Sequence, residues 1–99
     1  MTLVLRWTEQ AVNELGAIAE YVSLASPVYA EQVVERIVIR LRQAQDFPES
    51  GRRVPEASAT DVRELIEAPY RILYRTMPTA IEVIAIVHGR QDLRPHLPG

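Results

Sequence analysis

The sequence contains no cysteine and no lysine, and these absences exclude several kinds of site. Without cysteine, the chain cannot form a disulfide framework or a thiolate metal site, and it suits a reducing compartment. No apolar run approaches the roughly 20 residues needed to span a bilayer. Residues 1–7 also lack the basic segment and long apolar stretch of a signal peptide. We therefore expect a cytoplasmic protein that makes no membrane contact.

Size and charge indicate a single compact domain without a general affinity for nucleic acid. The 99 residues are 47% hydrophobic, which is enough for one core, so we expect one domain over residues 1–99. The formal net charge is −2, whereas nucleic-acid-binding domains are usually strongly basic. All 11 basic residues are arginines, whose planar guanidinium suits carboxylates and phosphates. We predict no direct sequence-specific DNA binding, so any nucleic-acid contact must be local.

The first half of the chain has the pattern of a strand followed by two helices. Alternation over residues 3–7 predicts a strand. Thr8 is a suitable N-cap for a helix ending near Leu24, and Ser26 followed by Pro27 begins a second helix that ends near Phe47. The apolar positions expected to face the core are Val12, Leu15, Ala19 and Val22 in the first helix, and Ala30, Val34, Ile37, Leu41 and Ala44 in the second.

The second half has the pattern of a loop followed by three strands. Residues 48–61 are rich in turn formers and predict a long surface loop, the most mobile part of the chain. Short β-like runs follow over residues 62–66, 70–76 and 80–87, with connections that suit antiparallel neighbours. Residues 81–87 are apolar at nearly every position and predict a central strand covered on both faces. The layout is β-α-α-β-β-β, an α+β fold in which a helical hairpin packs on a small antiparallel sheet.

Several polar and aromatic residues are interpreted as structural. Trp7 is expected in the core, and residues 93–99 as a tail that is frayed or ordered on contact. The glutamates of the two helices are expected on solvated faces, and Arg52 and Arg53 as ordinary surface residues. We assign none of them a function.

Four fragments carry a resemblance to a known family. They are the alanine- and leucine-containing helix after Trp7-Thr8, and then residues 47–52, 70–75 and 86–90. In this order and spacing, they resemble the toxins of the RelE/ParE superfamily of bacterial type II toxin–antitoxin systems, over residues 3–90. The resemblance implies the α+β fold described above.

Two branches of that superfamily imply different activities. RelE-like and YoeB-like members cut messenger RNA on the ribosome, and ParE-like members inhibit DNA gyrase. Arg71 and Arg90 match positions that the nucleases use. The nucleases also have lysines before the Tyr-Arg strand, where this chain has only Arg63 as a basic residue. Their C-terminal tyrosine corresponds to a position near His96. His88 and His96 could act as acid or base in a nuclease. The depleted basic set resembles the ParE branch, so gyrase inhibition is the first hypothesis.

One strand brings candidate binding residues to a single face of the sheet. Arg71, Leu73 and Arg75 share strand parity, while Tyr70, Ile72 and Tyr74 point the other way. Two interpretations stay open. The arginines either lie in water or pair with Glu64, Glu67 or Glu82, or they form a groove for an antitoxin or target. That groove would consist of Arg63, Arg71, Leu73, Arg75, His88 and Arg90.

The resemblance also implies partners. Such toxins are neutralised by an antitoxin whose C-terminal segment wraps them, so we expect a ParD-like antitoxin in a heteromeric complex. DNA gyrase is the expected target, in which case the chain binds and is not itself an enzyme, and it needs no cofactor or metal. The alternatives are a ribosome-dependent endoribonuclease, with Arg71, Arg90, His88 and His96 as catalytic residues, and a non-toxic relative that only binds its antitoxin.

Overall fold

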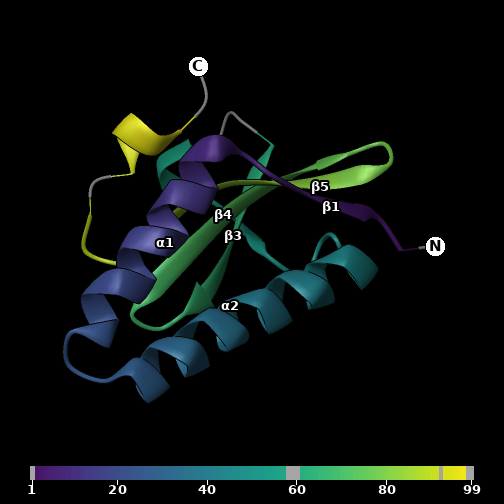
Figure 1. Ribbon diagram of the computed structural model, residues 1–99. Helices are drawn as coiled ribbons and strands as arrows, with labels where there is room; N and C mark the ends of the chain where they lie inside the picture. Colours follow the sequence, from purple (N-terminus) through teal and green to yellow (C-terminus); the bar gives the residue numbers. More distant parts are fainter. Residues whose placement is uncertain (1, 58–60, 92, 98–99) are drawn as a thin grey trace.

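A computed structural model of the chain describes residues 2–57, 61–91 and 93–97, and shows two helices on one face of a sheet (Figure 1). The α+β class and the predicted order of the main elements are confirmed. The elements are β1 (Val4–Trp7), α1 (Glu9–Ser23), α2 (Pro27–Asp46), β2 (Arg52–Arg53), β3 (Val62–Glu67), β4 (Tyr70–Met77) and β5 (Ala80–His88), with 3₁₀ turns η1 (Pro55–Ala57) and η2 (Arg94–His96).

Both helices begin at the predicted N-caps. The Thr8 hydroxyl accepts a hydrogen bond from the Ala11 amide at 3.1 Å, and the Ser26 hydroxyl accepts one from the Tyr29 amide at 3.1 Å. Each cap satisfies an amide that has no partner within its own helix. In α2, Pro27 occupies the first turn, where its missing N–H costs nothing.

The buried stripes of the helices differ from the prediction at single positions. In α1, Val12 is 52% exposed, while Ala11 is buried and Ile18 packs against the core. In α2, Val33 takes the buried place predicted for Val34. One residue along a helix turns the side chain by about 100°, and each helix must face both the sheet and the other helix. The sequence period locates the stripe but not its centre.

The sheet has the strand order β1-β5-β4-β3-β2. Strands β3, β4 and β5 form the predicted antiparallel meander, and β2 is antiparallel to β3. Strand β1 pairs in parallel with β5, so the sheet is mixed. A helical hairpin follows β1, so no tight turn fixes the direction of this strand. The predicted central position of β5 is confirmed, because it lies between β1 and β4.

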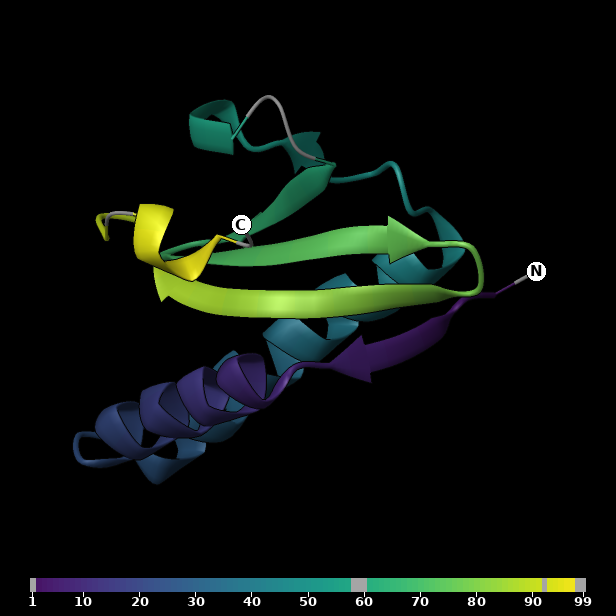
Figure 2. The ribbon, with the colours of Figure 1, turned by 90° about the horizontal axis from the view of Figure 1, so that it is seen from above.

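The sheet is covered on both faces by the chain itself. On the helix side, Ile37 and Leu41 pack with Ile72, Tyr74 and Ile86. The other face carries a second cluster that is closed by segments from far along the chain, namely Val54, Val62, Leu73, Ile84, Ala85, Val87 and Leu93. Figure 2 looks onto this face of the sheet, with α2 passing behind the strands and η2 in front of them. The expected second cover of β5 is therefore internal.

The segment predicted as a loop is partly ordered structure, which corrects that prediction over residues 48–57 and 61. It contains β2, η1, the buried Gly51 and the fully buried Val54. The Val54 amide donates to the Val62 carbonyl at 3.2 Å, which fastens the segment to β3. Residues 58–60 lie outside the described residues, as do residues 98 and 99 of the predicted tail. Among the described residues, no helix has the length and apolarity to cross a bilayer.

Candidate functional site

Arg71 lies in an ion cluster on the sheet face that points away from the helices, with two buried members, Arg71 and Glu64, and two exposed ones, Arg52 and Glu56. Its Nε donates to Glu64 Oε2 at 2.6 Å, and its Nη1 and Nη2 donate to the two carboxylate oxygens of Glu56 at 2.9 and 3.1 Å. Arg52 Nε donates to the other oxygen of Glu64 at 2.5 Å. Glu64 is 1% exposed and Arg71 is 9% exposed. Two arginines and two glutamates therefore form a cluster whose formal charges cancel.

Hydrogen bonding shifts the pKa of Glu56 and of Arg71 toward the charged form of each. The bond from Arg71, opposed by burial, lowers the pKa of the Glu56 carboxyl below its ordinary 4.5. The bond to Glu56, opposed by burial and assisted by Glu64, raises the pKa of the Arg71 guanidinium. Opposite charges in contact favour the charged form of each partner. At neutral pH, Arg71 is thus a cation whose charge is already compensated.

The other predicted residues of this face have structural contacts. Arg75 Nε donates to Glu82 Oε1 at 2.9 Å across the β4–β5 pair. Leu73 is fully buried in the second core cluster. The pairing of Arg71 with Glu64 and of Arg75 with Glu82 agrees with the first of the two interpretations. A pairing of either arginine with Glu67 is not found among the ion pairs of the described residues, because Glu67 points to the helix side, where it lies 3.9 Å from Arg40.

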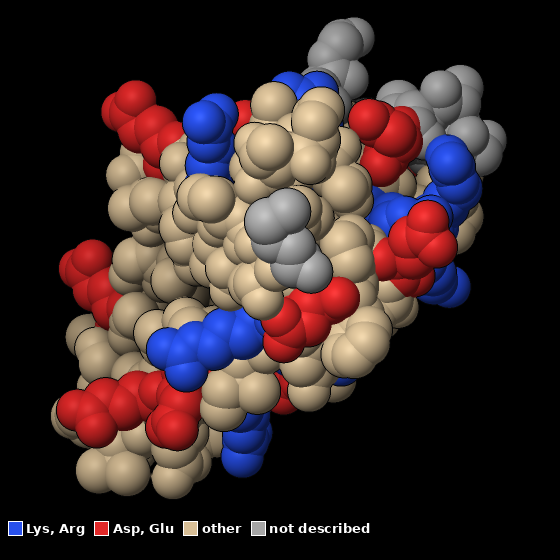
Figure 3. All heavy atoms as spheres, turned by 90° about the vertical axis from the view of Figure 1, so that its right-hand side faces the viewer, with Lys and Arg blue, Asp and Glu red and all other residues tan. Residues whose placement is uncertain are grey.

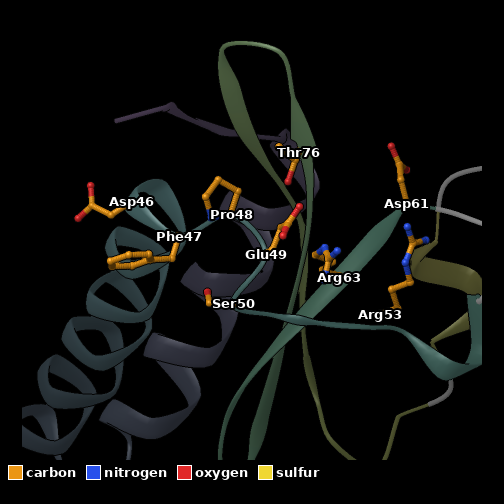
Figure 4. Close-up of a pocket in the computed structure, with 9 residues that line it drawn as sticks. All are labelled: Asp46, Phe47, Pro48, Glu49, Ser50, Arg53, Asp61, Arg63 and Thr76. Atoms are coloured by element: carbon orange, nitrogen blue, oxygen red, sulfur yellow. The ribbon is translucent and has the colours of Figure 1, made fainter. Parts of the chain in front are cut away.

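Arg63 does not share a face with Arg71, which corrects the proposed composition of the groove. Side chains alternate along β3, so the inward turn of Glu64 toward Arg71 sends Arg63 to the opposite face. There, Arg63 Nη1 donates to the Gly51 carbonyl at 2.8 Å. Figure 4 shows Arg63 in the middle of a hollow of about 660 Å³, with Phe47 at one end and Arg53 at the other.

His88 and Arg90 lie at the end of β5, and both are exposed. The His88 ring meets the Tyr70 ring edge to face at 6.1 Å between centroids, and its Nδ1 accepts from the Arg90 amide at 3.2 Å. The strand end thus presents an aromatic pair beside an exposed arginine. Among the interactions of the described residues, His96, which the nuclease alternative would bring to the same site, contacts neither His88 nor Arg90.

Instead, His96 contacts a glutamate that we assigned to a solvated face. Glu14 of α1 lies 2.9 Å from His96 Nδ1 through one carboxylate oxygen, and the other oxygen accepts from the Ile86 amide at 3.0 Å. The amide needs this acceptor because β1 leaves the edge of β5 after pairing with Val83. Glu14 follows the buried Ala11 by three residues and precedes Ile18 by four, a spacing that places it beside the core. The helical spacing in the sequence therefore already indicated that the Glu14 side chain lies beside the core.

Tyr74 holds the chain that leads into β2, a role missed in the sequence. Its hydroxyl donates to the Pro48 carbonyl at 2.7 Å and accepts from the Gly51 amide at 3.0 Å. A Cβ at position 51 would lie 2.6 Å from that hydroxyl and 2.7 Å from the Glu64 carbonyl. Only glycine allows this close approach, which places Arg52 beside Glu64.

The surface in Figure 3 shows no continuous basic area, because arginine and acidic side chains are interspersed over it. Within the part of the chain that the structure describes, no three His, Asp or Glu side chains are grouped to hold a metal ion.

Comparison with known proteins shows the family. Residues 5–93 match the ParE toxin of type II toxin–antitoxin system, parDE, so the chain belongs to this family of toxins. The chain is 33% identical over 90 residues to a candidate toxin of Sinorhizobium fredii, Y4kP, covering 89% of this chain and 90% of the relative. It is 32% identical over 84 residues to toxin RelE2 of Caulobacter vibrioides, covering 84% and 91%.

A solved structure extends this similarity to the fold. The chain resembles a protein of the chromosomal ParDE TA system from P. aeruginosa with a TM-score of 0.70 and 30% identity, over 88% of this chain and 96% of that one. The helical hairpin and mixed sheet are therefore the fold of this toxin superfamily. The names of the relatives come from both of its branches, so the cellular target needs a separate argument.

Proposed function

We propose that this chain is neutralised by a ParD-like antitoxin and that, when free, it inhibits DNA gyrase through protein contact without cutting RNA. The observation that carries the proposal is the compensation of Arg71 by Glu56 and Glu64. Gyrase is the target that the resemblance to the ParE branch implies. Both partners belong to the bacterial cytoplasm, which is where the proposal places the chain.

A site that cleaves RNA must stabilise negative charge that develops on the scissile phosphate. The arginine that does so needs donors free to reach that phosphate. Arg71 has donors on Nε, Nη1 and Nη2 committed to carboxylates, and the cluster has no net charge to offer. Moving a phosphate to Arg71 would first require displacing Glu56 or Glu64. This cost argues against the nuclease alternative.

The other groups of a nuclease set are also dispersed. His96 is engaged with Glu14, and Arg63 lies on the opposite face of the sheet from Arg71. A general acid or base must lie within hydrogen-bond reach of the proton that it transfers. The arrangement therefore favours action by binding. A ParD-like antitoxin is supported by the family match and by the similarity to a chain from a ParDE system.

The test is a pair of assays on the same purified chain. We expect a dose-dependent loss of gyrase supercoiling with accumulation of cleaved DNA, and no new 5′ ends in translated messenger RNA by primer extension. Premixing with the antitoxin encoded beside the toxin is the matched control, and it should restore supercoiling.

The two alternatives give different results. Cleavage of messages without any effect on gyrase would contradict the proposal and support an endoribonuclease, especially if the cuts disappear in Arg90→Ala. No effect in either assay, together with tight antitoxin binding, would identify a non-toxic relative.

A further inference from the structure

Two of the four tyrosines of the chain line one small hollow that the proposed function does not use. The hollow lies between α1 and the sheet, where β4 begins and β5 ends, and its volume is about 310 Å³. Ligand pockets of proteins range from about 300 to about 1,000 Å³, so this one suits a small molecule. Its lining residues are Glu14, Ala17, Ile18, Tyr21, Tyr70, Ile86, His88 and Gln91.

The wall that α1 contributes is a single stripe of the helix. Glu14, Ala17, Ile18 and Tyr21 follow one another at intervals of one helical turn, so their side chains point to the same side. Ala17 is small and leaves room in the middle of the stripe. Tyr21 is 76% exposed and borders the opening, whereas the Glu14 side chain is only 20% exposed and lies deeper.

The wall that the sheet contributes is an aromatic corner. Tyr70 and His88 are directly opposite each other on β4 and β5, and their rings stand at 81° to each other. Burial, and then the phenols of Tyr29 and Tyr21, raise the pKa of the Tyr70 hydroxyl, so Tyr21 acts on Tyr70 across the hollow. Three aromatic rings from the helix and the sheet thus border the same space.

The charge of the hollow is negative. No arginine lines it, and the His88 ring is neutral as placed, because its Nδ1 accepts from the Arg90 amide and therefore carries no proton. Glu14 is the one carboxylate among the lining residues. Its two oxygens already accept from the Ile86 amide and contact His96 Nδ1. The carboxylate therefore offers its charge more readily than a further hydrogen bond.

We propose that this hollow binds a small quaternary ammonium ion, a cation whose charge is spread over methyl groups. The faces of aromatic rings attract such cations, because the ring quadrupole is negative at its face. Glu14 adds a full negative charge and needs no donor hydrogen from the ligand. The side chains of Ala17, Ile18 and Ile86 supply apolar contacts for the methyl groups.

The same features disfavour other ligands. An anion would be repelled by Glu14 and would find no arginine in the lining. A neutral apolar molecule would remove water from Glu14 without compensating its charge. A primary ammonium is strongly hydrated and would need acceptors that Glu14 has already committed. The hollow lies on the helix side of the sheet, away from the Arg71 cluster, so the inference is independent of the gyrase proposal.

The experiment is an NMR titration of the ¹⁵N-labelled chain with choline chloride. A matched probe is the neutral analogue of choline in which a tert-butyl group replaces the trimethylammonium group, and sodium chloride at the same concentration controls for ionic strength. Choline should shift the amide signals of Ala17, Ile18, Tyr21 and His88 in a saturable manner. The neutral analogue should bind at least about tenfold more weakly, because it has the shape without the charge.

Two variants test the aromatic face and the charge separately. Tyr21→Leu removes one ring from an exposed position and should weaken choline binding about fivefold, whereas Phe47→Leu, a control at a position that is 69% exposed and outside the hollow, should bind as the parent chain does. Glu14→Gln keeps an acceptor for the Ile86 amide and should weaken binding about tenfold. Its control is Glu9→Gln, which removes an exposed charge from the same helix.

Several outcomes would show that the hollow is not a cation site. Choline could give no saturable shifts, or shifts centred on amides outside the hollow. The neutral analogue could bind as tightly as choline, which would assign the hollow to apolar ligands. Unchanged affinity in Tyr21→Leu or in Glu14→Gln, each compared with its control, would equally overturn the proposal.

Discussion

Loss of the Glu64 charge should destabilise the protein far more than loss of a surface carboxylate. Glu64 is 1% exposed and lies between Arg52 and Arg71. In Glu64→Gln, the amide keeps the shape, but its NH₂ group faces a guanidinium where an oxygen accepted before. Breaking a buried ion pair costs about 3–5 kcal/mol, because the remaining charge stays buried.

Two features of the structure lower the expected cost of Glu64→Gln below this range. Glu56 still binds Arg71 in the variant, and the Arg52 side chain is 63% exposed, so water can replace its lost partner. We therefore expect a loss of about 2–3 kcal/mol in the free energy of unfolding. For a chain of this length, the midpoint of thermal unfolding would fall by about 10–20 °C.

Urea unfolding followed by the fluorescence of the single tryptophan measures this loss, with the m-value as a check on two-state behaviour. Glu82→Gln is the control, because Glu82 and its partner Arg75 are both partly exposed, and the cost should stay below about 1 kcal/mol. If Glu64→Gln costs no more than Glu82→Gln, the ion cluster is not the structural element that we describe.

Three further predictions concern other contacts. Gly51→Ala should destabilise by about 2 kcal/mol or more through its clash with a buried hydroxyl, whereas Gly16→Ala, which meets nothing within 4 Å, should stabilise by about 0.5–1 kcal/mol in thermal melts. The depressed pKa of Glu56 means that its contribution is present above pH 4.5 and is lost as the pH falls through the lower folded value. The difference in the free energy of unfolding between the wild type and Glu56→Gln should therefore vanish in acid. A difference that stays constant with pH would contradict this explanation. Glu14→Ala should cost about 1–3 kcal/mol in urea unfolding because the Ile86 amide loses its acceptor, and Glu14→Gln should cost less because its amide oxygen can still accept.

The main elements of the fold could be predicted because their signals are local. A hydroxyl before each helix, a proline in the first turn of α2 and three β-like runs with short connections are all visible in the sequence. The parallel pairing of β1 with β5 could not be predicted, because it depends on how the helical hairpin returns to the sheet. The order in residues 48–57 also escaped prediction. It depends on Tyr74 and β3, which come later in the chain.

For the candidate site, strand parity gave the correct grouping of Arg71, Leu73 and Arg75 on one face. The same parity applied to β3 would have placed Arg63 on the other face from Glu64, since adjacent residues alternate. Glu56 could not be found as a partner of Arg71, because no period links a 3₁₀ turn to a strand. Long-range contacts of this kind become visible only when the chain is folded.

The most direct test of the central claim is the NMR signal of the Arg71 Nε–H group in the wild-type chain. If Arg71 belongs to a structural ion cluster with Glu56 and Glu64, this proton should exchange slowly with water, and its signal should not move when an RNA oligonucleotide is added. Fast exchange, or a shift that saturates with added RNA, would show an arginine free to bind phosphate and would contradict the account.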